Sequence, residues 1–127
     1  MGKIYRFDPI IYPFVLWITY DATAEELNEK FPDGDEFGEH FEEFPKDDAG
    51  AITSLVTDGE TGEDGALIRF LNKRNITFGH VSHEAGHYAL CLFKYINESV
   101  SLECQEPFCY IEEFVGECCE KVRTGNI

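Results

Sequence analysis

The stretch Val81-Ser82-His83-Glu84-Ala85-Gly86-His87-Tyr88-Ala89-Leu90 organises this chain, because it contains the pattern His83-Glu84-x-x-His87. On a helix, residues four apart lie nearly one above the other. Both imidazoles can then bind one Zn²⁺, and Glu84 lies beside them as a candidate general base. The pattern therefore predicts a zinc-binding helix.

The residues around this pattern separate into an apolar and a polar side. If each residue turns by roughly 100°, the apolar residues share one side of the helix. They are Phe78, Val81, Ala85, Tyr88, Ala89, Leu92 and Ile96. The other side carries His80, His83, Glu84, His87 and Cys91. We expect the helix to bury its apolar side and to turn its imidazoles toward a cleft. A helix whose histidines are simply hydrated or capping is the alternative interpretation.

Length and composition are typical of one globular domain, which we expect to span residues 1–127. Of the 127 residues, 43% are hydrophobic and 14% aromatic, which is enough for a hydrophobic core. The net charge of −15 argues against binding to nucleic acid, which needs clustered Lys and Arg. No stretch is typical of a membrane span, so no membrane partner is expected.

The five cysteines are an odd number without CxxC spacing, namely Cys91, Cys104, Cys109, Cys118 and Cys119. Such a set is a poor disulfide framework and a poor four-thiolate zinc site. We therefore expect buried, reduced thiols in a cytoplasmic protein.

Local signals predict an α+β fold, with a sheet of about four mainly antiparallel strands against the motif helix and a C-terminal helix. The expected strands are Lys3 to Phe7, Tyr12 to Tyr20, Ala51 to Thr57 and Ala66 to Leu71. The Gly- and Asp-rich residues 58–65 predict a hairpin between the last two.

Three helices are expected: Ala24 to Phe31, a motif helix running from its N-cap Thr77 to about Asn97, and a last helix with Pro107 in its first turn that ends near Arg123. The last helix should bury Phe108, Ile111, Val115, Cys118 and Val122.

Residues 33–50 are acidic with three embedded phenylalanines, Phe37, Phe41 and Phe44. We expect a loop or short helix that docks these rings. The spacing Asp33-x-Asp35 hints at a calcium loop, but the later ligands of an EF-hand are missing. His40 in this segment is interpreted as incidental.

A catalytic zinc site usually has three protein ligands and one open position. Glu106 at the start of the last helix is the expected third ligand, because the loop before it is long enough for that helix to fold back. Glu113 and Glu117 lie on roughly the same face and are alternatives. A hydrated glutamate favoured by the helix dipole is the competing interpretation of Glu106.

The motif His83-Glu84-Ala85-Gly86-His87, followed by Glu106-Pro107-Phe108-Cys109-Tyr110, resembles gluzincin-type zinc metallopeptidases. The resemblance is closest to short zinc peptidases encoded by bacteriophages, and it covers most of the chain. It implies a zincin-like domain with His83, His87 and Glu106 as zinc ligands. The chain departs from the larger gluzincins at Gln105 and Tyr110, where those proteins have Asn and Asp, so the partner that orients the histidines is not identified.

The expected activity is zinc-dependent hydrolysis of a peptide bond in a protein or peptide substrate, with Glu84 as general base. Tyr110 and His80 are candidate donors to the oxyanion. An extended substrate could pair with a free edge of the hairpin at Ala51 to Leu71. Two alternatives are a zinc-binding domain that binds a protein without turnover, and an acidic protein that mimics DNA. The phage resemblance implies the cytoplasm of a bacterial host, and the sequence specifies neither the oligomeric state nor the bond that is cut.

Overall fold

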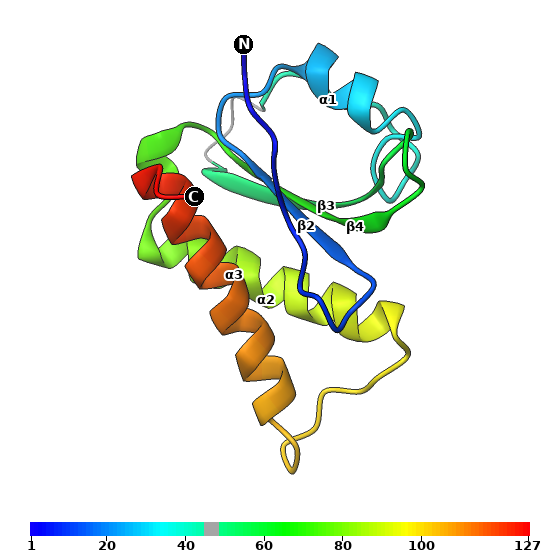
Figure 1. Cartoon of the computed structure of the whole chain (residues 1–127), viewed down its shortest axis with the longest axis vertical. Coiled ribbons are helices and arrows are strands. Elements are labelled where there is room, and N and C mark those ends of the chain that lie inside the picture. Colours follow the sequence, from blue (N-terminus) through cyan, green and yellow to red (C-terminus); the bar gives the residue numbers. More distant parts are fainter. Residues whose placement is uncertain (45–48) are drawn as a thin grey trace.

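The structure, a computed structural model, describes residues 1–44 and 49–127 of the chain. Four strands form one sheet in the order β1-β2-β4-β3 (Figure 1). The strands are β1 (Tyr5–Phe7), β2 (Val15–Thr19), β3 (Ala51–Thr57) and β4 (Asp64–Phe70). The helices are α1 (Ala24–Lys30), a short 3-10 helix η1 (Lys73–Asn75), α2 (Phe78–Tyr95) and α3 (Glu106–Thr124). The predicted α+β class is confirmed.

The sheet is mixed, with two antiparallel pairs and one parallel pair. β1 pairs with β2 and β3 with β4 in antiparallel fashion, whereas β2 and β4 run parallel. A parallel pair needs a crossover connection, and here the chain passes through α1 and β3 before it reaches β4. Gly65 permits the close approach of β4 to β2, because a Cβ at this position would lie 2.0 Å from the carbonyl oxygen of Val15. This order leaves β3 at one edge of the sheet.

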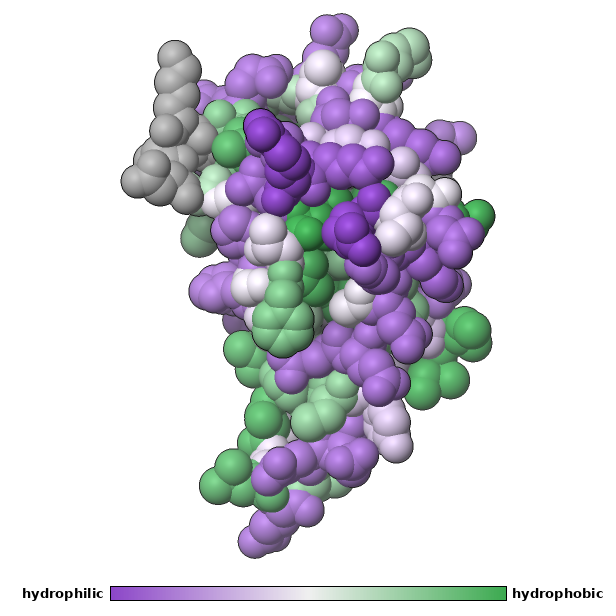
Figure 2. All heavy atoms as spheres, turned by 90° about the vertical axis from the view of Figure 1, so that its left-hand side faces the viewer, coloured by the Kyte–Doolittle hydropathy of each residue, from purple (hydrophilic) through white to green (hydrophobic). Residues whose placement is uncertain are grey.

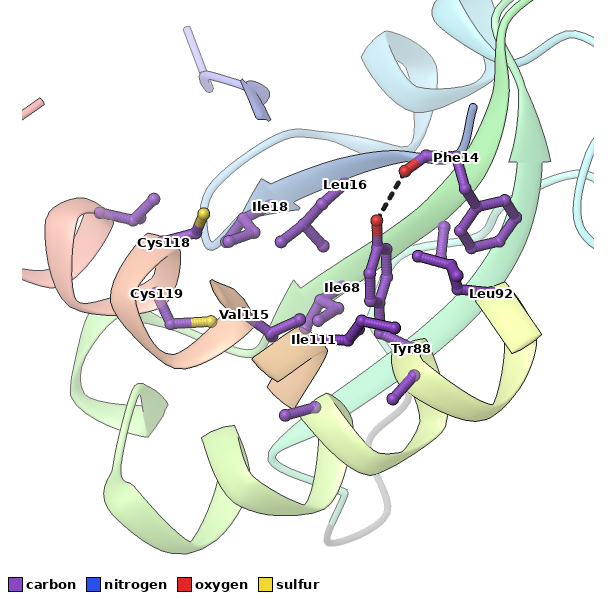
Figure 3. Close-up of a cluster of buried hydrophobic side chains, with 14 of the residues drawn as sticks. Phe14, Leu16, Ile18, Ile68, Tyr88, Leu92, Ile111, Val115, Cys118 and Cys119 are labelled. Atoms are coloured by element: carbon purple, nitrogen blue, oxygen red, sulfur yellow. Dashed lines mark hydrogen bonds between the residues drawn. The ribbon is translucent and has the colours of Figure 1, made fainter. Parts of the chain in front are cut away.

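One face of the sheet is covered by α2 and α3, and the main core lies between the sheet and these two helices (Figure 3). Its fully buried side chains include Leu16, Ile18, Ile68, Tyr88, Leu92 and Val115. The Tyr88 hydroxyl donates to the carbonyl oxygen of Phe14 at 2.6 Å. Burial raises the pKa of Tyr88, so the hydroxyl stays protonated and keeps this hydrogen bond from α2 to the segment entering β2.

The opposite face carries α1 and part of the acidic segment. Trp17 and Phe31 pack there at a centroid distance of 5.0 Å, and Phe41 joins them. Asn28 holds Phe41 in place, because its amide donates to the Phe41 carbonyl and its oxygen accepts from the Phe41 N–H. The docking of Phe41 is thus confirmed, but the same prediction is wrong for Phe37, which is 79% exposed. Residues 45–48 of the predicted acidic segment lie outside the described residues.

The helix ends follow their local signals closely. The capping box of Thr23 and Glu26 is present at α1, and the Thr77 hydroxyl accepts from the N–H of His80 at the start of α2. Phe78, expected in the buried stripe, is 89% exposed at the first position of α2, so the prediction is wrong for this residue. α2 stops at Tyr95, just before Asn97 takes a left-handed conformation.

The cysteines only partly match their prediction. All five are free, but Cys104 and Cys109 are exposed, whereas Cys118 and Cys119 are buried in the main core. Burial raises the pKa of each of the two buried thiols to about 12. In the described part of the chain, no helix is both long and apolar enough to cross a bilayer.

Candidate functional site

His83 and His87 lie one turn apart on the exposed side of α2, and their rings converge. Their Nε2 atoms are 3.2 Å apart, and the ring planes are inclined by 76°. Two nitrogen ligands of one tetrahedral zinc ion are separated by roughly 3.3 Å. The same distance allows one neutral ring to donate a hydrogen bond to the other. The pair therefore has the spacing that zinc requires before any side chain moves.

The two imidazoles border a cleft of about 420 Å³ between α2 and the edge strand β3. α2 contributes His83, Glu84, His87 and Cys91, β3 contributes Ala51, Ile52, Thr53 and Leu55, and the acidic segment contributes Glu36. The predicted cleft in front of the histidines is thus present, and a sheet edge forms its opposite wall.

Glu84 lies at the buried bottom of this cleft. It is 4% exposed, although the helical pattern placed it on the polar side with the histidines. The reason is tertiary: β3 packs along α2, and the Thr53 hydroxyl donates to Glu84 Oε1 at 2.7 Å. A hydrogen bond to a carboxylate in a partly desolvated place is strong, so one oxygen of Glu84 is held in position.

Glu36 enters the cleft from the acidic segment and was missed by the sequence reasoning. Its Oε2 accepts the backbone N–H of Leu55 at 2.7 Å. That N–H belongs to the edge strand β3, so the carboxylate occupies a donor that an added strand would use. Nothing in the sequence distinguished Glu36 from the acids around it, and Thr53 carried no signal beyond its place in a strand.

The expected third ligand is not assembled. Within residues 1–44 and 49–127, no three His, Cys, Asp or Glu side chains lie close enough to hold one ion. Glu106 is exposed at the start of α3, and neither Glu106, Glu113 nor Glu117 lines the cleft. Phe108, two residues after Glu106, packs edge-on against Phe93. Phe93 is six residues beyond His87, about 9 Å further along the helix, so the first turn of α3 is held away from the imidazoles.

The two candidate oxyanion donors also lie elsewhere. Tyr110 is 62% exposed and lines a separate hollow together with Pro9 and Tyr12. The His80 Nδ1 lies 2.7 Å from the carbonyl oxygen of Asn75, and its ring sits against Gly50. Neither Tyr110 nor His80 borders the cleft, so these two residues are not brought together with Glu84.

The hint of a calcium loop has a different explanation. The Asp35 carboxylate accepts the backbone N–H groups of Phe37 and Glu39 at 2.9 and 3.0 Å. It therefore closes its own turn, as aspartate commonly does in loops. His40 next to this turn is exposed and lies outside the cleft.

Comparison with known proteins adds no relative: no family model matches this sequence, and neither the curated proteins nor the solved structures give a match. The functional interpretation thus depends on the geometry of the cleft and on its motif.

Proposed function

We propose that the cleft between α2 and β3 binds zinc and hydrolyses peptide bonds. One observation carries the proposal: the His83 and His87 Nε2 atoms converge to 3.2 Å beside the buried carboxylate of Glu84. Hydrated side chains have several staggered rotamers available, and most combinations would leave the two rings apart. Spacing suited to zinc, next to a fixed carboxylate, supports hydrolysis better than a helix with merely hydrated histidines.

The residues of the chain have distinct tasks in this proposal. Zinc, when bound, is a Lewis acid and lowers the pKa of a coordinated water toward about 7. Glu84 accepts a proton from water and passes it to the leaving amine. Thr53 orients Glu84 through the hydrogen bond to Oε1. We retain Glu106 as the third ligand, which requires residues 96–105 to bring the first turn of α3 toward the cleft.

The class of substrate follows from the wall of the cleft. β3 is an edge strand, and an extended peptide can add to such an edge through backbone hydrogen bonds. A peptide bound there runs along the cleft past His83 and His87. Glu36 holds the Leu55 N–H, so a substrate strand has to displace this carboxylate. The proposed substrate is therefore an extended segment of a protein, and the proposed place of action is the bacterial cytoplasm.

Metal binding is tested first. Purified protein should contain about one zinc ion per chain, and its cobalt derivative should show the strong visible bands of a tetrahedral site. His83→Ala should lose both, whereas His40→Ala, which changes an exposed histidine outside the cleft, should keep both. Equal metal content in the two variants would refute the site. Glu106→Gln, compared with Glu113→Gln and Glu117→Gln, then identifies the third ligand by its loss of affinity.

Turnover is tested separately, with an unstructured protein such as casein as substrate. Wild type should cleave it, and Glu84→Gln should keep its zinc but lose most of the activity, a loss of about a hundredfold or more. Zinc bound by both proteins with no cleavage by either would favour the alternative of a zinc-binding module without turnover.

A further inference from the structure

A second groove, separate from the histidine cleft, runs between α2 and α3. Its volume is about 570 Å³. Ile76, Val81 and Ala85 line it from the α2 side, and Cys109 and Gly116 from α3. None of these residues borders the histidine cleft, because the two hollows lie on different sides of α2. Whatever the groove binds is therefore independent of the zinc proposal.

The floor of this groove is apolar, and none of residues 1–44 and 49–127 fills it. Ile76 and Ala85 are buried beneath it. A Cβ built on Gly116 would meet no atom within 4 Å, so the groove is open above this glycine. Phe78 lines the same groove with 89% of its surface exposed. Figure 2 views the side of the molecule where the first turns of α2 and the last turns of α3 lie, and it shows apolar side chains at the bottom of a hollow bordered by hydrophilic ones.

The rim of the groove is acidic. Glu112, Glu113, Glu120 and Arg123 line it, and Arg123 forms an ion pair with Glu120 at 2.6 Å. Within residues 1–44 and 49–127, no cation pairs with Glu112 or Glu113. Two carboxylates beside an apolar floor attract a ligand that combines apolar and basic groups.

The charge of the chain decides whether the groove binds a second copy of this chain or a basic partner. A second copy would bring a net charge of −15 to an acidic rim, and like charges brought together oppose association. A partner with lysine or arginine beside its apolar anchors removes that repulsion.

The shape of the groove favours a helix as its occupant. The small residues Ala85 and Gly116 let a third helix approach, and the groove follows α3 from Cys109 to Arg123, about 21 Å or four helical turns.

We propose that the groove between α2 and α3 binds an amphipathic helix of a partner protein, with apolar anchors on one side and basic residues flanking them. The anchors occupy the space above Gly116 and pack against Phe78. The basic flank lies over Glu112 and Glu113. This is the helix-in-groove mode of recognition, in which residues at i, i+3 or i+4, and i+7 enter the groove.

The test uses the full chain and two synthetic helical peptides of about four turns. Both contain the same leucines, lysines and alanines; in the first the leucines form one stripe, and in the second the order is shuffled. Because total charge is equal, nonspecific attraction to the acidic protein contributes equally to both. At physiological salt, measured by fluorescence anisotropy, the striped peptide should bind at least about tenfold more tightly. Equal affinity for both peptides would overturn the proposal.

Gly116→Leu fills the groove and should weaken binding of the striped peptide by about tenfold or more. Gly79→Leu is the matched control, since Gly79 also lies on a helix, a Cβ there also meets nothing within 4 Å, and it does not line the groove. Equal binding by the two variants overturns the proposal. Amide NMR shifts in the wild type give a second measurement: they should change at Ile76 to Ser82 and at Cys109 to Arg123. Changes at Thr53, His87 and Cys91 in the histidine cleft instead, or dimerisation that Gly116→Leu abolishes, would also overturn the proposal.

Discussion

The hydrogen bond between Thr53 and Glu84 leads to the most specific prediction for stability. Thr53→Val keeps the shape of the side chain and the β-propensity of the strand, but removes the hydroxyl that donates to Glu84 Oε1 at 2.7 Å. Glu84 is 4% exposed, so water cannot readily replace the lost donor. A hydrogen bond to a charged group contributes about 1.5–3 kcal/mol, and a neutral one about 0.5–1.5 kcal/mol.

We therefore expect Thr53→Val to lower the free energy of unfolding by about 2 kcal/mol in the wild type and by about 1 kcal/mol or less in Glu84→Gln. The difference, about 1 kcal/mol, is the coupling between the two side chains, which a double-mutant cycle measures. Urea unfolding followed by tryptophan fluorescence is suitable, because Trp17 is the only tryptophan, is fully buried, and lies in the core on the other face of the sheet.

Thr57→Val provides the control for this cycle. Thr57 lies on the same strand, and its hydroxyl donates to Asp64 rather than to Glu84. Its cost should be the same in the wild type and in Glu84→Gln, to within about 0.5 kcal/mol. If Thr53→Val also costs the same in both proteins, the Thr53–Glu84 bond does not form in solution, and the argument that β3 orients the general base is refuted.

Three further outcomes are expected. Gly86→Ala should raise stability by about 0.5–1 kcal/mol, seen as a higher Tm, because glycine is unfavourable inside a helix and a Cβ there would lie at an ordinary contact distance, 3.8 Å, from Glu112 Oε2. A lower Tm would contradict this. Burial raises the pKa of Cys118 and Cys119 from 9.0 to about 12. The preference of the fold for protonated thiols therefore contributes fully to the free energy of unfolding below pH 9, and this contribution is lost as the pH rises toward 12, because the thiols of the unfolded chain ionise first. The urea midpoint of the wild type should fall over this range, and that of the double variant Cys118→Ala/Cys119→Ala should fall less steeply. Glu36→Ala should speed amide exchange of Leu55 by about tenfold or more, because a charged hydrogen bond is lost, and unchanged exchange would show that the contact is absent.

The elements of the fold could be predicted because their signals are local. The capping box at Thr23 and Glu26 and the cap at Thr77 act within one turn of their helices, and each is present. The strand order could not be predicted, since the parallel pairing of Val15 with Gly65 joins residues 50 positions apart. No short-range pattern reports which strand lies in the middle of a sheet.

In the candidate site, too, features that depend on one helix could be predicted, and features that depend on contacts between distant segments could not. The convergence of His83 and His87 depends on one helix, so a spacing of four residues was sufficient to predict it. The burial of Glu84 depends on where β3 packs, and the contribution of Glu36 depends on a loop that crosses to the sheet edge. These contacts join segments 31 and 19 residues apart, and the sequence pattern contained no information on either.

Whether Glu106 can complete the site depends on the balance between apolar packing and metal binding. Moving the first turn of α3 loses the contact between Phe108 and Phe93, worth about 2–4 kcal/mol from burial and ring stacking. A full set of ligands in zinc-finger peptides contributes on the order of 10 kcal/mol, so the share of one further ligand is of the same order as that loss. If Glu106 completes the site, zinc should change the environment of Phe108, observed by fluorine NMR of fluorophenylalanine-labelled protein and assigned by Phe108→Leu. His83→Ala should show no such change. If the wild type binds zinc while the Phe108 resonance stays in place, the third ligand does not come from the start of α3, and the acidic residue already in the cleft, Glu36, takes its place as the candidate.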